Sequence, residues 1–264
     1  MYAFNYHRPS SLAEASKLLA DAADGKFMAG GQTLLPTLKQ RLASPSDLID
    51  LGGIADLQGI KVDGSSVSIG AGTRHGVVAK SAEVAKAIPA LAKLAGGIGD
   101  AQVRNMGTIG GSLANNDPAA DYPAAVLGLN ATIHTNKRSI AADDYFKGMF
   151  ETALEDGEII VKVSFPIPKR AGYVKFPNPA SRYVMVGAMV AETAGGIRVA
   201  INGAGPCVFR HKDMEAALAK SFSADALKGI KTDPKAMNND IHASAEYRAH
   251  LVGVIAGRAV LAAG

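Results

Sequence analysis

Two short glycine-rich segments place the strongest constraint on how this chain can fold. The segments "MAGGQT" (28–33) and "GTIGGS" (107–112) each place a Gly-Gly pair shortly before a hydroxyl side chain, after an apolar or strand-like approach. Consecutive glycines let backbone N–H groups converge on one point, because no Cβ blocks a close approach. Two such nests facing one another would suit a pyrophosphate, whereas a single Gly-Gly pair usually marks a turn.

Neither segment matches the G-x-G-x-x-G dinucleotide fingerprint or the lysine-bearing P-loop. The second segment lies in "NMGTIGGSLANNDPAADYPA" (105–124), whose Gly, Asn, Asp and Pro residues predict neither a helix nor buried core. Within it, Asp117 is interpreted as a turn residue that satisfies its own backbone. For Asp121, between Pro118 and Pro123, two interpretations stay open at this point: a turn residue of the same kind, or an acceptor of a hydrogen bond from a ribose hydroxyl, as acidic residues are in dinucleotide sites.

The composition is that of an ordinary soluble globular protein and argues against several classes. The 264 residues are 48% hydrophobic and 20% charged, and the net charge of +4 comes from scattered Lys and Arg. This distribution argues against a nucleic-acid or membrane-surface patch. No apolar run approaches the ~20 residues of a membrane span, and "MYAFNYHRPSS" lacks the pattern of a signal peptide. We therefore expect a cytoplasmic protein.

Few residues of the chain are candidates for catalysis or metal binding. The single Cys207 excludes an internal disulfide and a cysteine-ligated iron–sulfur cluster within the chain. Its apolar, Gly- and Pro-rich surroundings indicate inert packing. His75 follows the predicted hairpin and could approach a ligand of the loops, but a surface or capping role is expected for it. The six histidines show no metal-ligand spacing. We therefore expect no metal site and no catalytic residue.

Apolar periodicity divides the chain into three blocks. The first block, of roughly fifty residues, predicts a helix over 12–22, a strand over 26–30, a short helix interrupted by Pro36 and a strand over 47–53. The second predicts a hairpin over 60–72, helices around 74–87 and 89–98, a short helix near 141–148, and strands over 130–136 and 157–168. The third predicts two strands within 181–205, a surface loop over 231–240, and helices over 209–222, 223–230 and 242–263. Strands followed by helices indicate an α+β layer in this last block.

The two loops, in this order and followed by "DPAADYPA", resemble the FAD-binding medium subunit of the molybdenum hydroxylases, the family of carbon monoxide dehydrogenase, xanthine dehydrogenase and aldehyde oxidoreductase. The resemblance extends to "FNYHRPSSLAEASKLLA", "LKQRLASPSDLIDLGGIADLQGI" and "HASAEYRAHLVGVIAGRAV", and so covers nearly the whole chain. It implies an α+β fold with a PCMH-type FAD-binding domain over 1–169, made of α/β subdomains at about 1–56 and 57–169. A smaller C-terminal domain over 170–264 would carry an antiparallel sheet and helices.

The resemblance also implies which residues contact the FAD. One side of the diphosphate would be wrapped by Ala29, Gly30, Gly31, Gln32 and Thr33. The other side and the ribityl chain would be held by Thr108, Ile109, Gly110, Gly111 and Ser112. Four single positions match family residues near the adenosine (Asp121), the cofactor's apolar surroundings (Ile98 and Ile160) and the flavin (Lys175). After Lys175 the stretch "FPNPASRYVMVG" lacks the acidic residue that relatives often carry. Tyr183 is expected to be structural packing, with stacking on the flavin ring as the alternative.

The function implied by the resemblance is that of an oxidoreductase subunit that transfers electrons. A large partner subunit with a molybdopterin cofactor would oxidise the substrate, and a small partner subunit with two [2Fe-2S] clusters would deliver electrons singly. FAD in this chain would pass them in pairs to NAD, a quinone or oxygen. The complex would be a heterohexamer, a dimer of heterotrimers, in the cytoplasm or held at the inner face of the membrane by its partners. Two alternatives remain: a stand-alone FAD-dependent oxidase or dehydrogenase, and a non-catalytic scaffold without flavin.

Overall fold

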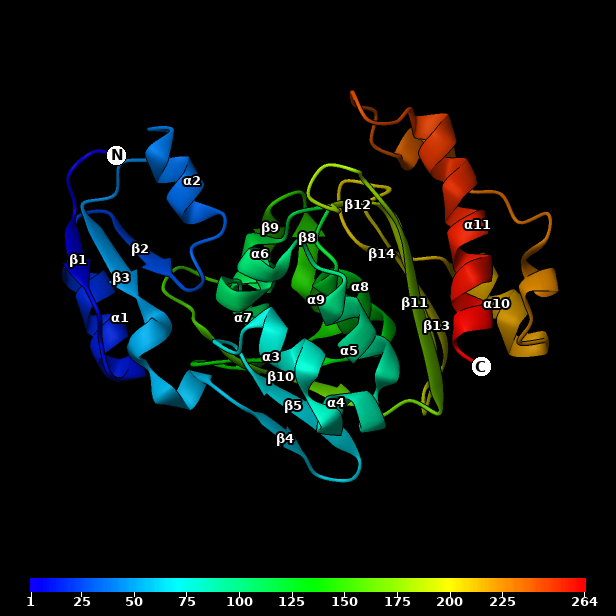
Figure 1. Ribbon diagram of the computed structural model, residues 1–264, viewed down its shortest axis with the longest axis horizontal. Helices are drawn as coiled ribbons and strands as arrows, with labels where there is room; N and C mark the ends of the chain where they lie inside the picture. The colour runs from blue at the N-terminus through cyan, green and yellow to red at the C-terminus, as the bar shows by residue number, and fades with distance from the viewer.

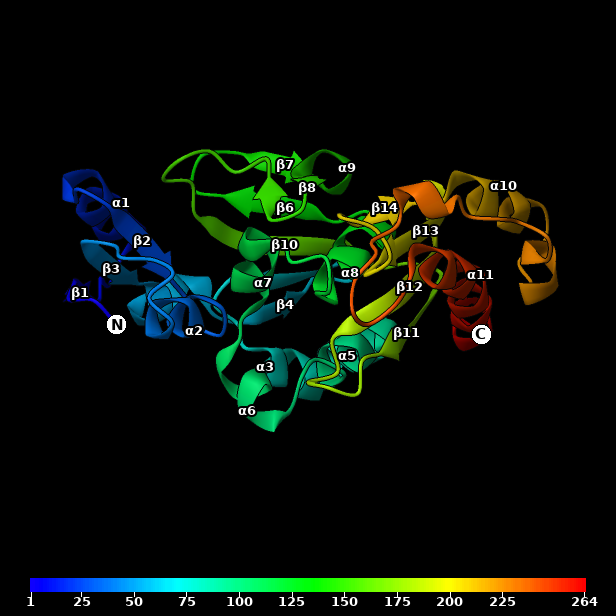
Figure 2. The ribbon, with the colours of Figure 1, turned by 90° about the horizontal axis from the view of Figure 1, so that it is seen from above.

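The chain, described over residues 1–264 by a computed structural model, is built on three main sheets that follow one another along its long axis (Figures 1 and 2). The first sheet is parallel, and the second and third are antiparallel. No helix is both long enough and apolar enough to cross a bilayer.

The N-terminal block is a small α/β unit. It consists of β1 (Asn5–His7), α1 (Leu12–Asp21), β2 (Gly25–Met28), α2 (Leu34–Lys39), β3 (Asp47–Asp50) and the 3-10 turns η1 (Leu51–Gly53) and η2 (Ala55–Leu57), with the strand order β1-β3-β2. The Ser11 hydroxyl accepts a hydrogen bond from the Glu14 N–H and so caps α1 where the periodicity predicts its start. Buried Ala15, Ile49 and Ile54 form the core of this unit.

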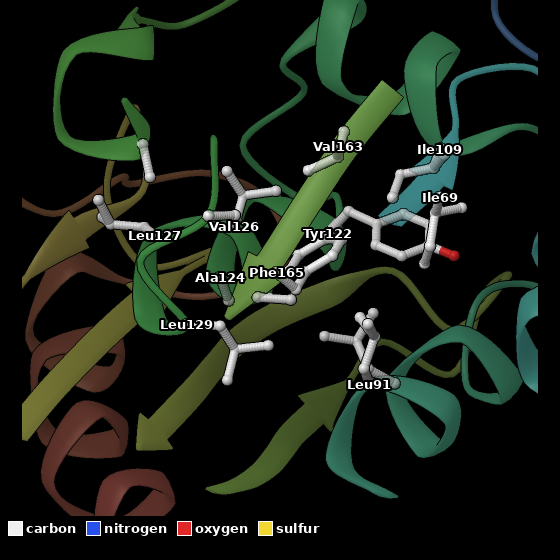
Figure 3. Packing of buried hydrophobic residues seen from close by; sticks show 14 of the residues in the cluster. Ile69, Leu91, Ile109, Tyr122, Ala124, Val126, Leu127, Leu129, Val163 and Phe165 are labelled. Carbon is white, nitrogen blue, oxygen red and sulfur yellow. The ribbon is translucent and has the colours of Figure 1, made fainter. Parts of the chain in front are cut away.

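The middle block packs helices on a five-stranded sheet. Its strands, in the order β4-β5-β10-β6-β7, are β4 (Ile60–Val62), β5 (Ser66–Gly70), β6 (Thr132–Thr135), β7 (Ser139–Ala141) and β10 (Ile160–Pro166). Its helices are α3 (His75–Lys80), α4 (Ala82–Ala87), α5 (Pro89–Gly96), α6 (Ala101–Met106), α7 (Ile109–Asn115), α8 (Tyr122–Gly128) and α9 (Ala142–Tyr145), and a hairpin joins β8 (Phe146–Gly148) to β9 (Glu151–Thr152). Figure 3 shows its core, where Tyr122 lies among Ile69, Ile109 and Phe165.

The prediction that residues 105–124 form neither helix nor core is wrong. Helix α7 starts after Thr108, whose hydroxyl accepts a hydrogen bond from the Gly111 N–H, and all seven residues of α8 are buried. Helix α8 begins with Pro123 in its first turn, where the missing N–H of proline costs nothing. The prediction failed because glycine and proline usually indicate turns, whereas in α7 and α8 they allow the helices to pack closely.

The C-terminal block is a four-stranded antiparallel sheet covered by helices on both faces. It contains β11 (Arg170–Pro177), β12 (Val184–Thr193), β13 (Gly196–Asn202), β14 (Phe209–Arg210), α10 (Lys212–Lys220), η3 (Ala224–Leu227), η4 (Pro234–Ala236) and α11 (Ala245–Ala262). Helices α5 and α8 pack on the side toward the middle block, and α11 packs on the opposite side (Figure 1). The edge strand β11 was not predicted, because Arg170, Gly172 and Lys175 interrupt its apolar pattern.

The predicted α+β class, with a C-terminal antiparallel sheet and helices, is confirmed. The hydrophobic core of the middle block also takes in residues of the C-terminal sheet, including Tyr173, Met189 and Ala200. The division of the chain at residue 170 therefore stays a prediction about domains that share one core.

We predict that Gly172→Ala lowers the free energy of unfolding by roughly 1–3 kcal/mol through overpacking. A Cβ at Gly172 in β11 would collide with the Ala259 carbonyl oxygen on α11 and lie 2.7 Å from the nitrogen of Ala263, which caps that helix. Gly253→Ala in α11 is the control, because a Cβ there meets nothing within 4 Å. Urea unfolding should show a loss for the first variant alone; equal stabilities would contradict this packing.

Candidate functional site

A long cleft runs between the N-terminal block and the middle block, with a volume of about 1330 Å³. Its walls come from Arg8 and from residues within six segments, which are 26–37, 50–58, 71–77, 98–121, 154–160 and 181–183. Figure 1 places the end of β2 and α2 opposite α6 and α7. Both glycine-rich loops thus line the same cleft, as the sequence predicts.

The first loop, Ala29–Thr33, presents unused backbone donors to the cleft. None of its five backbone N–H groups donates a hydrogen bond within the chain. Gly31 has φ +70°, a conformation that lets consecutive N–H groups point to one side. The Gln32 side chain bonds the Gly30 carbonyl at 3.3 Å, and the Thr33 hydroxyl makes no capping bond to α2. This loop has the geometry of an anion-binding nest.

The second loop, Thr108–Ser112, does not form the second nest expected from the sequence. The N–H groups of Ile109 and Gly110 donate to the carbonyls of Thr73 and Ala71, at 3.2 and 2.8 Å. Those of Gly111 and Ser112 donate to the Thr108 hydroxyl and carbonyl, at 3.2 and 3.0 Å. The loop therefore offers a ligand the hydroxyls of Thr108 and Ser112 rather than backbone donors.

The two loops meet at a contact that admits only glycine. A Cβ at Gly30 would collide with the Met106 carbonyl oxygen and lie 2.7 Å from the Cα of Gly107. A Cβ at Gly111 would lie 3.7 Å from the Cβ of Ala29. Glycine at position 30 therefore allows the first loop to lie in direct contact with the backbone at the start of the second.

Asp121 and Lys175 form a buried ion pair behind one wall of the cleft. The Lys175 ammonium lies 2.9 Å from Asp121 Oδ1 and donates to the carbonyls of Gly97 and Arg182, both at 2.9 Å. The Tyr173 hydroxyl donates to Asp121 Oδ1 at 2.9 Å. Burial raises the pKa of the Asp121 carboxyl, against the effects of Lys175 and Tyr173. Asp121 lines the cleft but Lys175 does not, and its charge is fully engaged within the protein.

The three isoleucines predicted at the site lie in two different environments. Ile98, after α5, and Ile160, at the start of β10, line the cleft. Ile109 does not, because its side chain is fully buried in the core of the middle block. The first turn of α7 rotates this residue inward.

The expectation that His75 lies at the surface is wrong. The side chain is 5% exposed, lines the cleft, and leaves Nδ1 without a hydrogen-bond partner. Burial, followed by the charge of Arg104, lowers the pKa of His75 to about 4. A β-bridge between Arg74 and Thr108 turns the imidazole inward, beneath Gly107. Sequence periodicity carries no signal for a single bridge of this kind.

The β11–β12 turn with Tyr183, and the buried Glu158, also line the cleft. The turn between β11 and β12 holds Ser181 and Arg182 at φ +57° and +59°, and places Tyr183, 58% exposed, at the cleft. Glu158 is buried and bonded by Arg138 at 3.0 Å, and this bond lowers the pKa of the carboxyl to about 2. Tyr183 is therefore exposed, whereas the sequence analysis expected it to pack within the structure.

Two other sequence interpretations are confirmed. Asp117 Oδ1 accepts a hydrogen bond from the Ala119 N–H at 2.9 Å, which is the turn geometry expected of it. Cys207 is half-buried, and burial raises the pKa of its thiol, as expected of a packing residue.

No three His, Cys, Asp or Glu side chains lie together in a way that could hold a metal ion.

Comparison with known proteins gives the same answer by sequence and by structure. Residues 2–168 match the model of the FAD binding domain in molybdopterin dehydrogenase. The chain is 36% identical over 276 residues to the nicotine 6-hydroxylase medium subunit of Paenarthrobacter nicotinovorans, covering 99% of this chain and 98% of that one. It is 33% identical over 277 residues to the carbon monoxide dehydrogenase medium chain of Hydrogenophaga pseudoflava, covering 98% and 96%.

Solved structures agree. Carbon monoxide dehydrogenase from Hydrogenophaga pseudoflava superposes with a TM-score of 0.88 at 35% identity, over 98% of this chain and 96% of that chain. Reconstituted carbon monoxide dehydrogenase from Oligotropha carboxidovorans gives a TM-score of 0.90 at 32% identity, over 99% and 97%. The fold and cleft thus define an FAD-binding domain. The chain belongs to the FAD-binding medium subunits of the molybdenum-containing dehydrogenases, as the resemblance implies.

We predict that Lys175→Met destabilises the protein by about 3 kcal/mol, because it leaves the buried Asp121 carboxyl without its cation. The double variant Lys175→Met/Asp121→Asn should be less destabilised, since it removes both charges. Denaturant unfolding of wild type, both single variants and the double variant measures the coupling energy. If the losses of stability in the two single variants add up to the loss in the double variant, the two side chains are not coupled.

We predict that the contribution of Glu158 to the free energy of unfolding depends on pH. Its folded-state pKa of about 2 lies below its ordinary value of 4.5, so its contribution is fully present above pH 4.5 and is lost as the pH falls toward 2. Glu158→Gln should therefore cost roughly 1.5–3 kcal/mol at neutral pH and progressively less below pH 4.5. Glu155→Gln, whose side chain is 61% exposed, is the control. A loss that is independent of pH would contradict the assignment.

Proposed function

We propose that FAD binds in the cleft with its diphosphate between the two glycine-rich loops, and that the chain uses it to carry electrons within a molybdenum hydroxylase. The observation that supports this most directly is the first loop: five backbone N–H groups of residues 29–33 without an acceptor, facing the hydroxyls of Thr108 and Ser112. A pyrophosphate satisfies such donors. The cleft volume of about 1330 Å³ exceeds the ~300–1,000 Å³ of an ordinary small-molecule pocket and suits an extended dinucleotide.

The loop residues would hold the diphosphate from both sides with different groups. Residues 29–33 would donate backbone N–H groups, and Gly31 would keep those donors aligned. Thr108 and Ser112 would donate hydroxyls, while Gly110 and Gly111 leave space. Ile109 would act from the core, by fixing the first turn of α7.

The remaining predicted residues would shape the two ends of the cleft. Ile98 and Ile160 offer apolar surface for a planar ring. Asp121 has both carboxylate oxygens near Lys175, so its contact with the adenosine part would use the lone pairs left on those oxygens. Lys175 would act as a positioning residue that holds Asp121 and the 181–183 turn, and not as a free cation beside the flavin.

Bound FAD would supply redox chemistry that accepts electrons one at a time and gives them up in pairs. The chain's own residues would bind and orient it and exclude water from it. The electrons would come from [2Fe-2S] clusters of a small partner subunit, after substrate oxidation at the molybdopterin cofactor of a large one. NAD, a quinone or oxygen would receive them.

The assembly we propose follows the relatives that are named as medium chains or subunits. The chain would be the middle member of a heterotrimer, and two heterotrimers would form a heterohexamer. It would work in the cytoplasm, or at the inner face of the membrane through its partners. A stand-alone FAD oxidase is less well supported, because the chain matches nearly the whole length of relatives that are named as medium subunits or chains. A scaffold without flavin is disfavoured by the intact first loop.

The test is a purification of the chain with its native partners, followed by absorption spectroscopy and metal analysis. We expect flavin bands together with iron–sulfur absorbance and molybdenum. Flavin alone, with turnover of a small substrate by the isolated chain, would indicate a self-sufficient flavoenzyme. No flavin would support the scaffold.

Within the same preparation we predict that Gly111→Val weakens FAD binding by at least about 100-fold, or ~2.7 kcal/mol. The valine side chain would lie between Thr108 and Ala29, in the space the diphosphate would take. Gly253→Val, at an open position of α11, is the control. FAD titration and circular dichroism separate lost binding from lost fold; a folded Gly111→Val variant with full FAD occupancy would refute the loop assignment.

A further inference from the structure

His75, the first residue of α3, has a polar side chain that the protein buries without pairing it. The side chain is 5% exposed, and neither ring nitrogen hydrogen-bonds within the chain. The other histidines are hydrogen-bonded (His7, His134 and His211) or exposed (His242 and His250). A buried polar group without a partner costs free energy, so it calls for an explanation. Because the side chain lines the cleft, we expect its partner there.

Two backbone hydrogen bonds fix His75 beside the second glycine-rich loop. Its N–H donates to the Gly107 carbonyl at 2.9 Å, and the Ile109 N–H donates to the Thr73 carbonyl at 3.2 Å. These bonds flank the β-bridge at the start of that loop. The imidazole therefore belongs to the same wall of the cleft as the Thr108 hydroxyl.

The packing around the ring decides which nitrogen is available to a ligand. The Tyr122 ring packs against the imidazole, with the two centroids 5.3 Å apart and the planes tilted by 52°. Nδ1 is fully enclosed. Nε2 lies beside Gly107, where a Cβ would come within 2.6 Å of it. Gly107 also meets Gly30 where the two loops touch, so Nε2 is the nitrogen at the junction of the loops.

The chemistry of the ring suits an oxygen acceptor. Burial, followed by the charge of Arg104, lowers the pKa of His75 to about 4, so near pH 7 the ring is neutral and carries one N–H. With its proton on Nε2, the ring gives this wall an N–H donor. The second loop itself offers none, because its own N–H groups are used within the chain.

We propose that His75 is a cofactor-binding residue, whose Nε2–H donates a hydrogen bond to a phosphate oxygen of the FAD diphosphate. This inference rests on the proposed function and deepens it, because it adds a donor to the wall opposite the first loop. No group of the chain pairs this nitrogen, so the bond to the phosphate costs no bond within the protein. The unpaired imidazole lowers the stability of the protein alone and raises its affinity for the cofactor.

The experiment compares wild type, His75→Leu and His75→Gln in the purified complex after its flavin has been removed. FAD is titrated back by calorimetry. We expect His75→Leu to bind FAD at least about tenfold more weakly, or ~1.4 kcal/mol. ADP, which carries a diphosphate without the flavin, should lose affinity by the same factor. His75→Gln can place an amide N–H near the position of Nε2, and its FAD affinity should return to within about threefold of wild type, or ~0.7 kcal/mol.

The matched control is Tyr122→Phe, which removes another buried polar atom without a partner but from a residue that does not line the cleft. Its FAD affinity should stay within about twofold of wild type, or ~0.4 kcal/mol. The flavin-free forms of His75→Leu and Tyr122→Phe should melt at temperatures no lower than wild type, because each change removes an unpaired buried polar atom.

The outcomes separate this inference from the function on which it rests. Unchanged FAD affinity in His75→Leu, or an equal loss in Tyr122→Phe, would overturn this inference alone. A loss that comes with a lower melting temperature and is not restored in His75→Gln would show a structural role and overturn it as well. Unchanged ADP affinity beside weaker FAD binding would overturn the diphosphate as the acceptor. A wild-type complex that takes up no FAD would instead overturn the proposed function.

Discussion

The ammonium of Lys175 joins the C-terminal sheet to two segments of the middle block that lie more than fifty residues away in sequence. It reaches the end of α5 through the Gly97 carbonyl, the start of α8 through Asp121, and the β11–β12 turn through the Arg182 carbonyl. All three of its hydrogens are used, and Tyr173 completes the shell of the carboxylate. Because an isolated buried charge is costly, these segments hold one another in place, and they form one wall of the cleft. The rest of the site depends on that wall being fixed.

Across the cleft, the two glycine-rich loops look alike in sequence but play different physical roles. The first keeps its N–H groups free, since no helix turn or strand uses them. The second uses its N–H groups to cap α7 and to bond the carbonyls of Ala71 and Thr73, and so becomes a rigid support with hydroxyls at its surface. Contact at Gly30 then sets the distance between them. One surface of free backbone donors and one surface of hydroxyls together suit a ligand held from both sides.

Much of this arrangement could be predicted from local pattern. The amphipathic helix α1, the β4–β5 hairpin and the paired strands β12 and β13 all follow from periodicity and turn residues. The two loops and Asp121 were correctly expected at one site, because their order along the chain resembles a known family. Residues 105–124 were misjudged, because glycine and proline favour turns locally but here permit close helix packing.

By itself, the amino-acid sequence determined the succession of elements, the two glycine-rich loops and the family, since these depend on neighbours along the chain. Only the tertiary structure decided that Ile109 faces the core, that His75 is buried at the cleft, and that Lys175 is engaged by Asp121. It also decided that the imidazole of His75 finds no hydrogen-bond partner within the chain. The physical reason is that the role of a polar group depends on which partners packing brings within hydrogen-bond distance, and these partners lie far away in sequence.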